Sequence, residues 1–158
     1  MSKFSAAIKW QRGPCEAFSD NQYSRGHTWH FDGGVVVPAS SSPDVVPLPL
    51  SVEENVDPEE AFIASISSCH MLTFLGIAAK QRYVIDSYTD EAVGFLEEDL
   101  SGKGFVSKVI LRPKIIFTGD KQPSLSQLEK LHHLAHLHCF IANSVKTEIT
   151  TEIIQMEY

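Results

Sequence analysis

The chain has 158 residues, of which 43% are hydrophobic and 21% are charged, and its formal net charge is −7. Such a length and composition are typical of one globular domain with a hydrophobic core, so we expect a single domain over residues 1–158. The acidic balance argues against a nucleic-acid partner, which would need a basic surface, and gives no support for binding to an anionic membrane.

The first part of the chain predicts three short strands. Residues 4–10 alternate loosely, and residues 27–31 alternate again before an Asp-Gly-Gly turn. Asp-Gly between two strand-like runs is typical of a hairpin, so residues 35–37 are the expected returning strand. The proline-rich segment 38–49 is predicted to be a long functional loop, such as an active-site lid or a dimer arm.

The clearest helix begins after Asp57. Asp57 suits the N-cap, Pro58 suits the first helical position, and Glu60 stands where a capping box places glutamate. Residues 61–80 follow without a break and are apolar on nearly every side. We therefore expect a buried central helix.

The rest of the chain predicts two strands, a helix and a last strand. The strands cover residues 83–95 and 105–117, with Pro113 marking an edge or a bulge. A second helix is expected over residues 125–144 and a final strand over residues 145–158. The order βββ-α-ββ-α-β indicates an α+β fold with antiparallel sheets around the long central helix.

The cysteines bear on the compartment and the chemistry. The N-terminus has no apolar run of signal-peptide length, and no apolar run approaches the ~18 residues of a membrane span. We therefore expect a cytoplasmic protein. Cys15, Cys69 and Cys139 are an odd number and form no disulfide framework, whereas a transient catalytic disulfide is compatible with a reducing compartment.

Cys69 and Cys139 each lie within a predicted helix, and each adjoins a histidine, His70 and His138. A buried cysteine most often behaves as a small hydrophobic residue. A histidine can lower the pKa of a thiol where the two side chains meet, but consecutive helical residues point ~100° apart. The residues alone leave open whether the two thiols are inert or form a reactive pair.

Metal binding is another alternative. His132, His136 and Cys139 share one helix face, and zinc accepts such ligands. Without a CxxC or HExxH pattern the signal is weak, and a partly solvated helix face is the preferred interpretation of His132 and His133. We expect neither a bound metal nor a cofactor.

The segment from Asp57 to Cys69 resembles the OsmC/Ohr family of osmotically inducible protein C and organic hydroperoxide resistance proteins. That family starts a helix with Asn-Pro-Glu and has a cysteine ten residues after the glutamate, a spacing that Glu59 and Cys69 keep. Cys139 resembles the second family cysteine, and Arg25 matches the position of the active-site arginine. Aspartate in place of the asparagine, the histidine after Cys69 and the loop 38–49 are departures, so the chain resembles a divergent branch.

The resemblance implies a thiol peroxidase that reduces organic hydroperoxides in oxidative stress defence. Cys69 would become a sulfenic acid, Cys139 would condense with it to a disulfide, and an external dithiol would restore both thiols. Arg25 would stabilise the thiolate and polarise the peroxide, and Glu59 would hold the arginine through a bidentate pair. The alternative is a non-catalytic protein that binds a small ligand or a metal on the same scaffold.

The resemblance also implies an intertwined homodimer with its sites at the interface. Glu59 and Cys69 are ten residues apart, which is roughly 15 Å along a straight helix. Either the helix bends or Glu59 serves Cys69 of a second subunit, and we expect the second arrangement. Since the helix dipole acts only over the first turn, Arg25 has to supply most of the stabilisation of a Cys69 thiolate.

Overall fold

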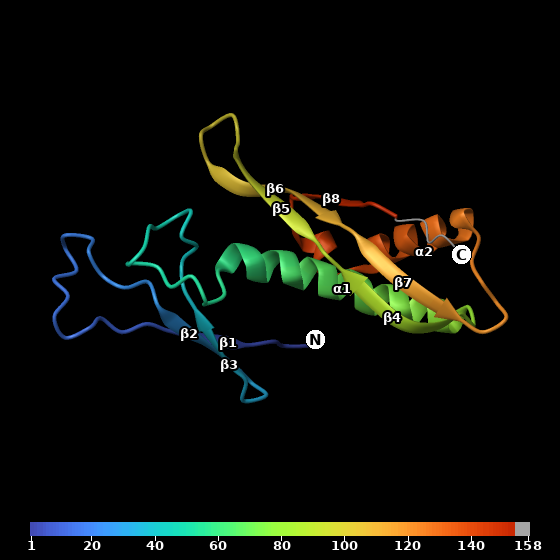
Figure 1. Cartoon of the computed structure of the whole chain (residues 1–158), viewed down its shortest axis with the longest axis horizontal. Helices are drawn as coiled ribbons and strands as arrows, with labels where there is room; N and C mark the ends of the chain where they lie inside the picture. The colour runs from blue at the N-terminus through green and yellow to red at the C-terminus, as the bar shows by residue number, and fades with distance from the viewer. Residues whose placement is uncertain (154–158) are drawn as a thin grey trace. The chain divides into compact units, whose positions relative to one another are not determined.

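The computed structural model describes residues 1–153 and has the predicted α+β class of fold (Figure 1). Two compact units are distinguished, Met1–Ala61 and the residues from Phe62 onward. A single domain over residues 1–158 stays a prediction.

A three-stranded antiparallel sheet forms the centre of the first unit. Its strands, in spatial order, are β1 (Ala6–Lys9), β2 (His27–Phe31) and β3 (Val36–Ala39). The turn between β2 and β3 has Gly34 at a φ of +87°, a left-handed conformation that glycine adopts without strain. The hairpin and all three strands confirm the prediction.

The segment between β3 and the first helix is long but anchored at both ends. Ala39 forms an isolated parallel bridge with Val56, and the hydroxyl of the buried Ser40 accepts a hydrogen bond from Val52 N at 2.9 Å. The predicted loop 38–49 is therefore a folded connection, and its first two residues belong to β3.

Helix α1 (Pro58–Lys80) begins as predicted. Glu60 N donates to Asp57 Oδ1 at 2.7 Å and Asp57 N donates to Glu60 Oε2 at 3.3 Å, which completes the capping box. By length and composition alone α1 could also cross a membrane, which is weak evidence because the core helix of a soluble protein passes the same test.

The burial of α1 in the single chain is one-sided, whereas the sequence suggested burial on nearly every side. A stripe with four-residue spacing is buried: Ile66, His70, Phe74 and Ala78. A second stripe of small residues and one leucine is exposed: Ser65, Ser68, Leu72, Gly76 and Ala79.

Each long strand predicted after α1 is divided in two. The four resulting strands are β4 (Val84–Asp90), β5 (Val93–Glu98), β6 (Gly104–Leu111) and β7 (Pro113–Thr118). The strands divide where Arg112 N donates to Asp90 Oδ1 at 2.6 Å instead of to a strand, and where Pro113 has no N–H to donate. β4 pairs with β7, while β5 and β6 belong to another sheet.

The C-terminal elements also differ from the prediction. Helix α2 (Leu125–His138) ends six residues early, and Cys139 is its C-cap, followed by the short helix η1 (Ala142–Ser144). Strand β8 (Glu148–Thr151) pairs with β6 in parallel, so the sheets are not all antiparallel. The predicted strand over residues 145–158 is therefore too long, and its residues 154–158 lie outside the described residues.

Two apolar clusters form the core of the second unit. The larger joins α1, α2 and the β4–β7 pair through Phe74, Leu131 and Ile115. The smaller places Ile66 of α1 against Val109 and Leu111 of β6. Packed side chains thus hold α1, which carries Cys69, and α2, which ends directly before Cys139.

Candidate functional site

The second unit brings the two predicted cysteines together. Cys139 is fully buried and Cys69 is partly exposed, and both are free thiols. Burial raises the pKa of the Cys139 thiol to about 11, and a side-chain hydrogen bond with Cys69 acts in the same direction. One thiol of this contact is therefore open to a reagent while the other is shielded.

The end of α2 holds Cys139 in place. Ala142 N donates to Cys139 Sγ at 3.3 Å, and Asn143 N donates to Cys139 O at 3.1 Å. The Asn143 side chain donates in turn to Leu137 O at 2.9 Å. The helix end and the following turn thus fix both the backbone and the sulfur of this residue.

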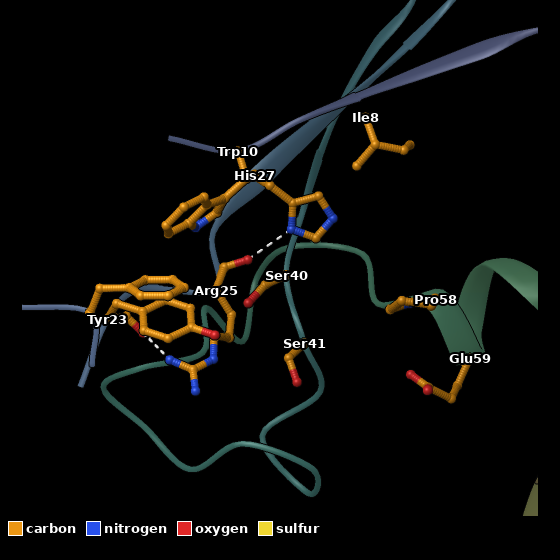
Figure 2. A pocket seen from close by; sticks show the side chains of 10 residues that line it. Ile8, Trp10, Tyr23, Arg25, His27, Ser40, Ser41, Pro58 and Glu59 are labelled. Atoms are coloured by element: carbon orange, nitrogen blue, oxygen red, sulfur yellow. Dashed lines mark hydrogen bonds between the residues drawn. The ribbon is translucent and has the colours of Figure 1, made fainter. Parts of the chain in front are cut away.

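A cavity of about 520 Å³ in the first unit contains the other two predicted site residues, Arg25 and Glu59 (Figure 2). Arg25 comes directly before β2, and Glu59 lies in the first turn of α1. The connection after β3 adds Ser40 and Ser41 to the wall. One guanidinium, one carboxylate and the hydroxyl groups of Ser40, Ser41 and Tyr23 are therefore among the polar groups around this cavity.

The expected bidentate pair between Arg25 and Glu59 is not formed. The guanidinium of Arg25 donates to Asn21 Oδ1 at 2.8 Å, to Asn21 O at 3.2 Å and to Tyr23 O. It also lies over the Tyr23 ring, 3.7 Å from the centroid. Figure 2 shows the Glu59 carboxylate apart from this guanidinium.

Three aromatic side chains of the cavity wall were not identified in the sequence. Trp10, Phe18 and Tyr23 contact one another, with ring centroids 4.6 to 5.8 Å apart. Trp10 Nε1 also donates to Ser24 O at 2.8 Å. The sequence signal for this wall was the recurrence of aromatic residues in the otherwise polar segment before Arg25.

His27 is a further residue that sequence reasoning did not single out. Trp29 Nε1 donates to His27 Nε2 at 2.9 Å, and because an indole only donates, His27 Nδ1 carries the proton. His27 Nδ1 then donates to Arg25 O at 2.7 Å, as Figure 2 shows. This chain of hydrogen bonds fixes the backbone of the arginine.

The interpretation of His132 as a partly solvated residue is wrong. His132 is 4% exposed, whereas His133 is exposed as expected. The ring of His132 faces α1, where its Nδ1 shares a hydrogen bond of 3.0 Å with His70 Nε2. Among residues 1–153, no group of three His, Cys, Asp or Glu side chains is arranged to hold a metal ion.

Comparison with known proteins finds solved structures both of high and of low sequence identity to this chain. An OsmC-like protein of unknown function from Vibrio cholerae is 65% identical, with 98% of this chain and 100% of that chain covered and a TM-score of 0.95. An organic hydroperoxide resistance protein from Elizabethkingia anophelis shares the fold at 15% identity, with 97% and 94% covered and a TM-score of 0.69. No curated protein matches the sequence.

The fold and the thiol contact define an α+β protein whose long helix presents one cysteine to a second at the end of α2. The family profile described as OsmC-like protein matches residues 52–154. The chain therefore belongs to the OsmC-like family, which includes organic hydroperoxide resistance proteins and which the motif around Cys69 indicated.

Proposed function

We propose that this protein is a cysteine-based peroxidase that reduces organic hydroperoxides. The contact between the partly exposed Cys69 and the buried Cys139, both free thiols, is the observation that carries this proposal. An exposed thiolate can attack a peroxide, and a second thiol in contact with it can resolve the product. The relationship to organic hydroperoxide resistance proteins supports the same reaction.

The cycle has three balanced steps. The Cys69 thiolate attacks the O–O bond and becomes a sulfenic acid, while the departing alkoxide takes up a proton and leaves as an alcohol. The Cys139 sulfur then displaces hydroxide from the Cys69 sulfur, and this hydroxide combines with the Cys139 proton to give water. An external dithiol returns two electrons and two protons, which restores both thiols.

Arg25 and Glu59 are assigned to the peroxide step. In the proposed reactive state the Arg25 guanidinium leaves Asn21 and Tyr23, pairs with Glu59 and stabilises the thiolate. Arg25→Ala is then expected to lower peroxide reactivity far more than Arg12→Ala, because Arg12 is exposed and donates only to a backbone carbonyl. Equal losses in the two variants would mean that the arginine is wrongly assigned.

The aromatic wall of the cavity suits the organic part of the hydroperoxide. Trp10, Phe18 and Tyr23 line it, and the lining is mostly apolar. The same cavity favours a second candidate function, the binding of a small apolar ligand without turnover. Loss of thiols on addition of peroxide distinguishes the two.

Thiol counting tests the activity directly. One equivalent of cumene hydroperoxide is added to the reduced protein, and free thiols are counted with time. We expect a rapid loss of two thiols that Cys69→Ser abolishes and Cys15→Ser leaves intact. In Cys139→Ser, dimedone should trap the Cys69 sulfenic acid, and unchanged thiols in the wild-type protein would refute the proposal.

We further propose a cytoplasmic homodimer in which Arg25 and Glu59 of one subunit serve Cys69 of the other. The exposed small-residue stripe of α1 supports close contact with a second chain. Mixing Arg25→Ala with Cys69→Ser chains tests this, because only a shared site regains activity, in about a quarter of the sites. No recovery in a mixture shown to contain heterodimers, or a monomer at micromolar concentration by sedimentation, would refute the shared site.

A further inference from the structure

Two histidines from distant parts of the sequence meet in the core of the second unit. His70 of α1 and His132 of α2 are 62 residues apart, yet their rings lie edge to edge in nearly one plane, with centroids 5.3 Å apart and an interplanar angle of 10°. His70 Nε2 and His132 Nδ1 share a hydrogen bond of 3.0 Å, and the residues are 2% and 4% exposed. Polar pairing therefore occurs where a core normally has apolar contacts.

Stability alone does not account for this pair. Nε2 of His132 is buried and has no hydrogen-bond partner among the described residues, which is unfavourable for a polar atom. Phe74 already packs on the His132 ring at 4.4 Å between centroids, so the site accepts aromatic rings. Two phenylalanines would fill a similar space without an unpaired nitrogen, and such replacements of buried polar pairs are often neutral or stabilising.

The surroundings keep both rings neutral at neutral pH. Burial lowers the pKa of His70 to about 4 and that of His132 to about 3. His136 on α2 acts on His70 in the same direction, while Asp90 on β4 opposes it. Tyr88 on β4 has a pKa raised by burial, so it faces the cluster as a neutral phenol. Two neutral imidazoles share one proton between the facing nitrogens, which makes the bond directional.

We propose that His70 and His132 are positioning residues for the disulfide step, holding α2 against α1 so that Cys139 stays opposite Cys69. This inference rests on the proposed function. His70 directly follows Cys69, and His132 lies two helical turns before Cys139. Apolar attraction has no preferred direction, whereas a hydrogen bond between two rings fixes a distance and a direction between the helices. A disulfide requires narrow sulfur and Cβ geometry, so a small slide of α2 would separate the thiols.

Two variants at one position test the bond itself. The amide of His132→Asn can occupy the place of Nδ1 and keep the bond to His70, whereas the amide of His132→Gln occupies the place of Nε2 and cannot. We expect disulfide formation in His132→Gln, and in the double variant His70→Phe/His132→Phe, to be about tenfold to a hundredfold slower than in the wild type. His132→Asn should restore most of the rate.

The readout separates positioning from stability and from peroxide chemistry. The rate of sulfenic acid formation at Cys69 is measured by trapping with dimedone. This rate should stay within about twofold of the wild type in every variant, because Cys69 itself is unchanged. Diamide, which removes two electrons and two protons from a thiol pair, forms the same disulfide without peroxide. Slow formation of the Cys69–Cys139 disulfide by diamide in His132→Gln and the double variant supports the positioning role even where peroxide proves not to be the substrate. Disulfide formation as fast as in the wild type, both in His132→Gln and in a folded double variant, would overturn the positioning role.

Discussion

Alkylation of the cysteines is the most direct test of the unequal roles of the two thiols. Reduced protein is treated with excess iodoacetamide at pH 8, and each cysteine is followed by mass spectrometry of its peptide. A pKa of about 11 leaves about 0.1% of Cys139 ionised at pH 8, against about 9% for a thiol at the ordinary value of 9.0. Ionisation alone thus slows Cys139 by about 90-fold, and burial adds to this.

The pH dependence distinguishes ionisation from simple inaccessibility. Between pH 8 and pH 10 the ionised fraction of Cys139 rises by about 90-fold, so its alkylation should accelerate by a similar factor. Cys69→Ala should also speed the reaction at pH 8, because the hydrogen bond with Cys69 raises the pKa of Cys139. Alkylation of Cys139 at pH 8 as fast as that of the exposed Cys15 would refute the reasoning.

Three further predictions concern stability. Burial keeps His70 and His132 neutral while the unfolded chain gains protons near pH 6.5, so stability should fall from there towards pH 4, by up to about 1.4 kcal/mol per pH unit for each histidine. Urea titrations should show this slope in the wild type but not in His70→Phe/His132→Phe, and equal slopes would contradict it. Arg82 closes α1 with a φ of +63°, so Arg82→Gly should raise the free energy of unfolding by about 0.5–1 kcal/mol, and a lower urea midpoint would contradict this. Asp57→Ala should lower the free energy of unfolding by about 1 kcal/mol through loss of the cap, whereas the exposed Asp44→Ala should change it little; similar urea midpoints would argue against the cap.

Features that depend on neighbouring residues were predictable from the sequence. The start of α1 follows from Asp57, Pro58 and Glu60, which act within one turn, and the β2–β3 hairpin follows from its Asp-Gly turn. The contact between Cys69 and Cys139 was anticipated through the family resemblance rather than through periodicity. Local patterns thus located the elements, while the pairing of distant elements needed other information.

Features set by distant contacts were missed for a physical reason. The division of the long strands depends on a bond from Arg112 N to the Asp90 side chain, 22 residues away in sequence. The burial of His132 depends on His70, 62 residues away, because only a polar partner makes that position tolerable for an imidazole. An amphipathic pattern shows that a residue is polar but not whether it has a hydrogen-bond partner in the core. A buried, paired histidine therefore gives the same pattern as a solvated one.

The high pKa of Cys139 gives the histidine pair its significance in the proposed cycle. At pH 7 a thiol with a pKa of about 11 is ionised in only about one molecule in ten thousand, which works against its attack on a sulfenic acid. A thiolate of high pKa is the stronger nucleophile, which recovers part of this loss. The larger compensation available is proximity, because well-oriented groups within one molecule can react as if at about 10⁵ M or more. Such a gain exists only while the two sulfurs stay aligned. Because burial keeps Cys139 mostly protonated, the rate of disulfide formation depends on the contacts that fix α2 against α1.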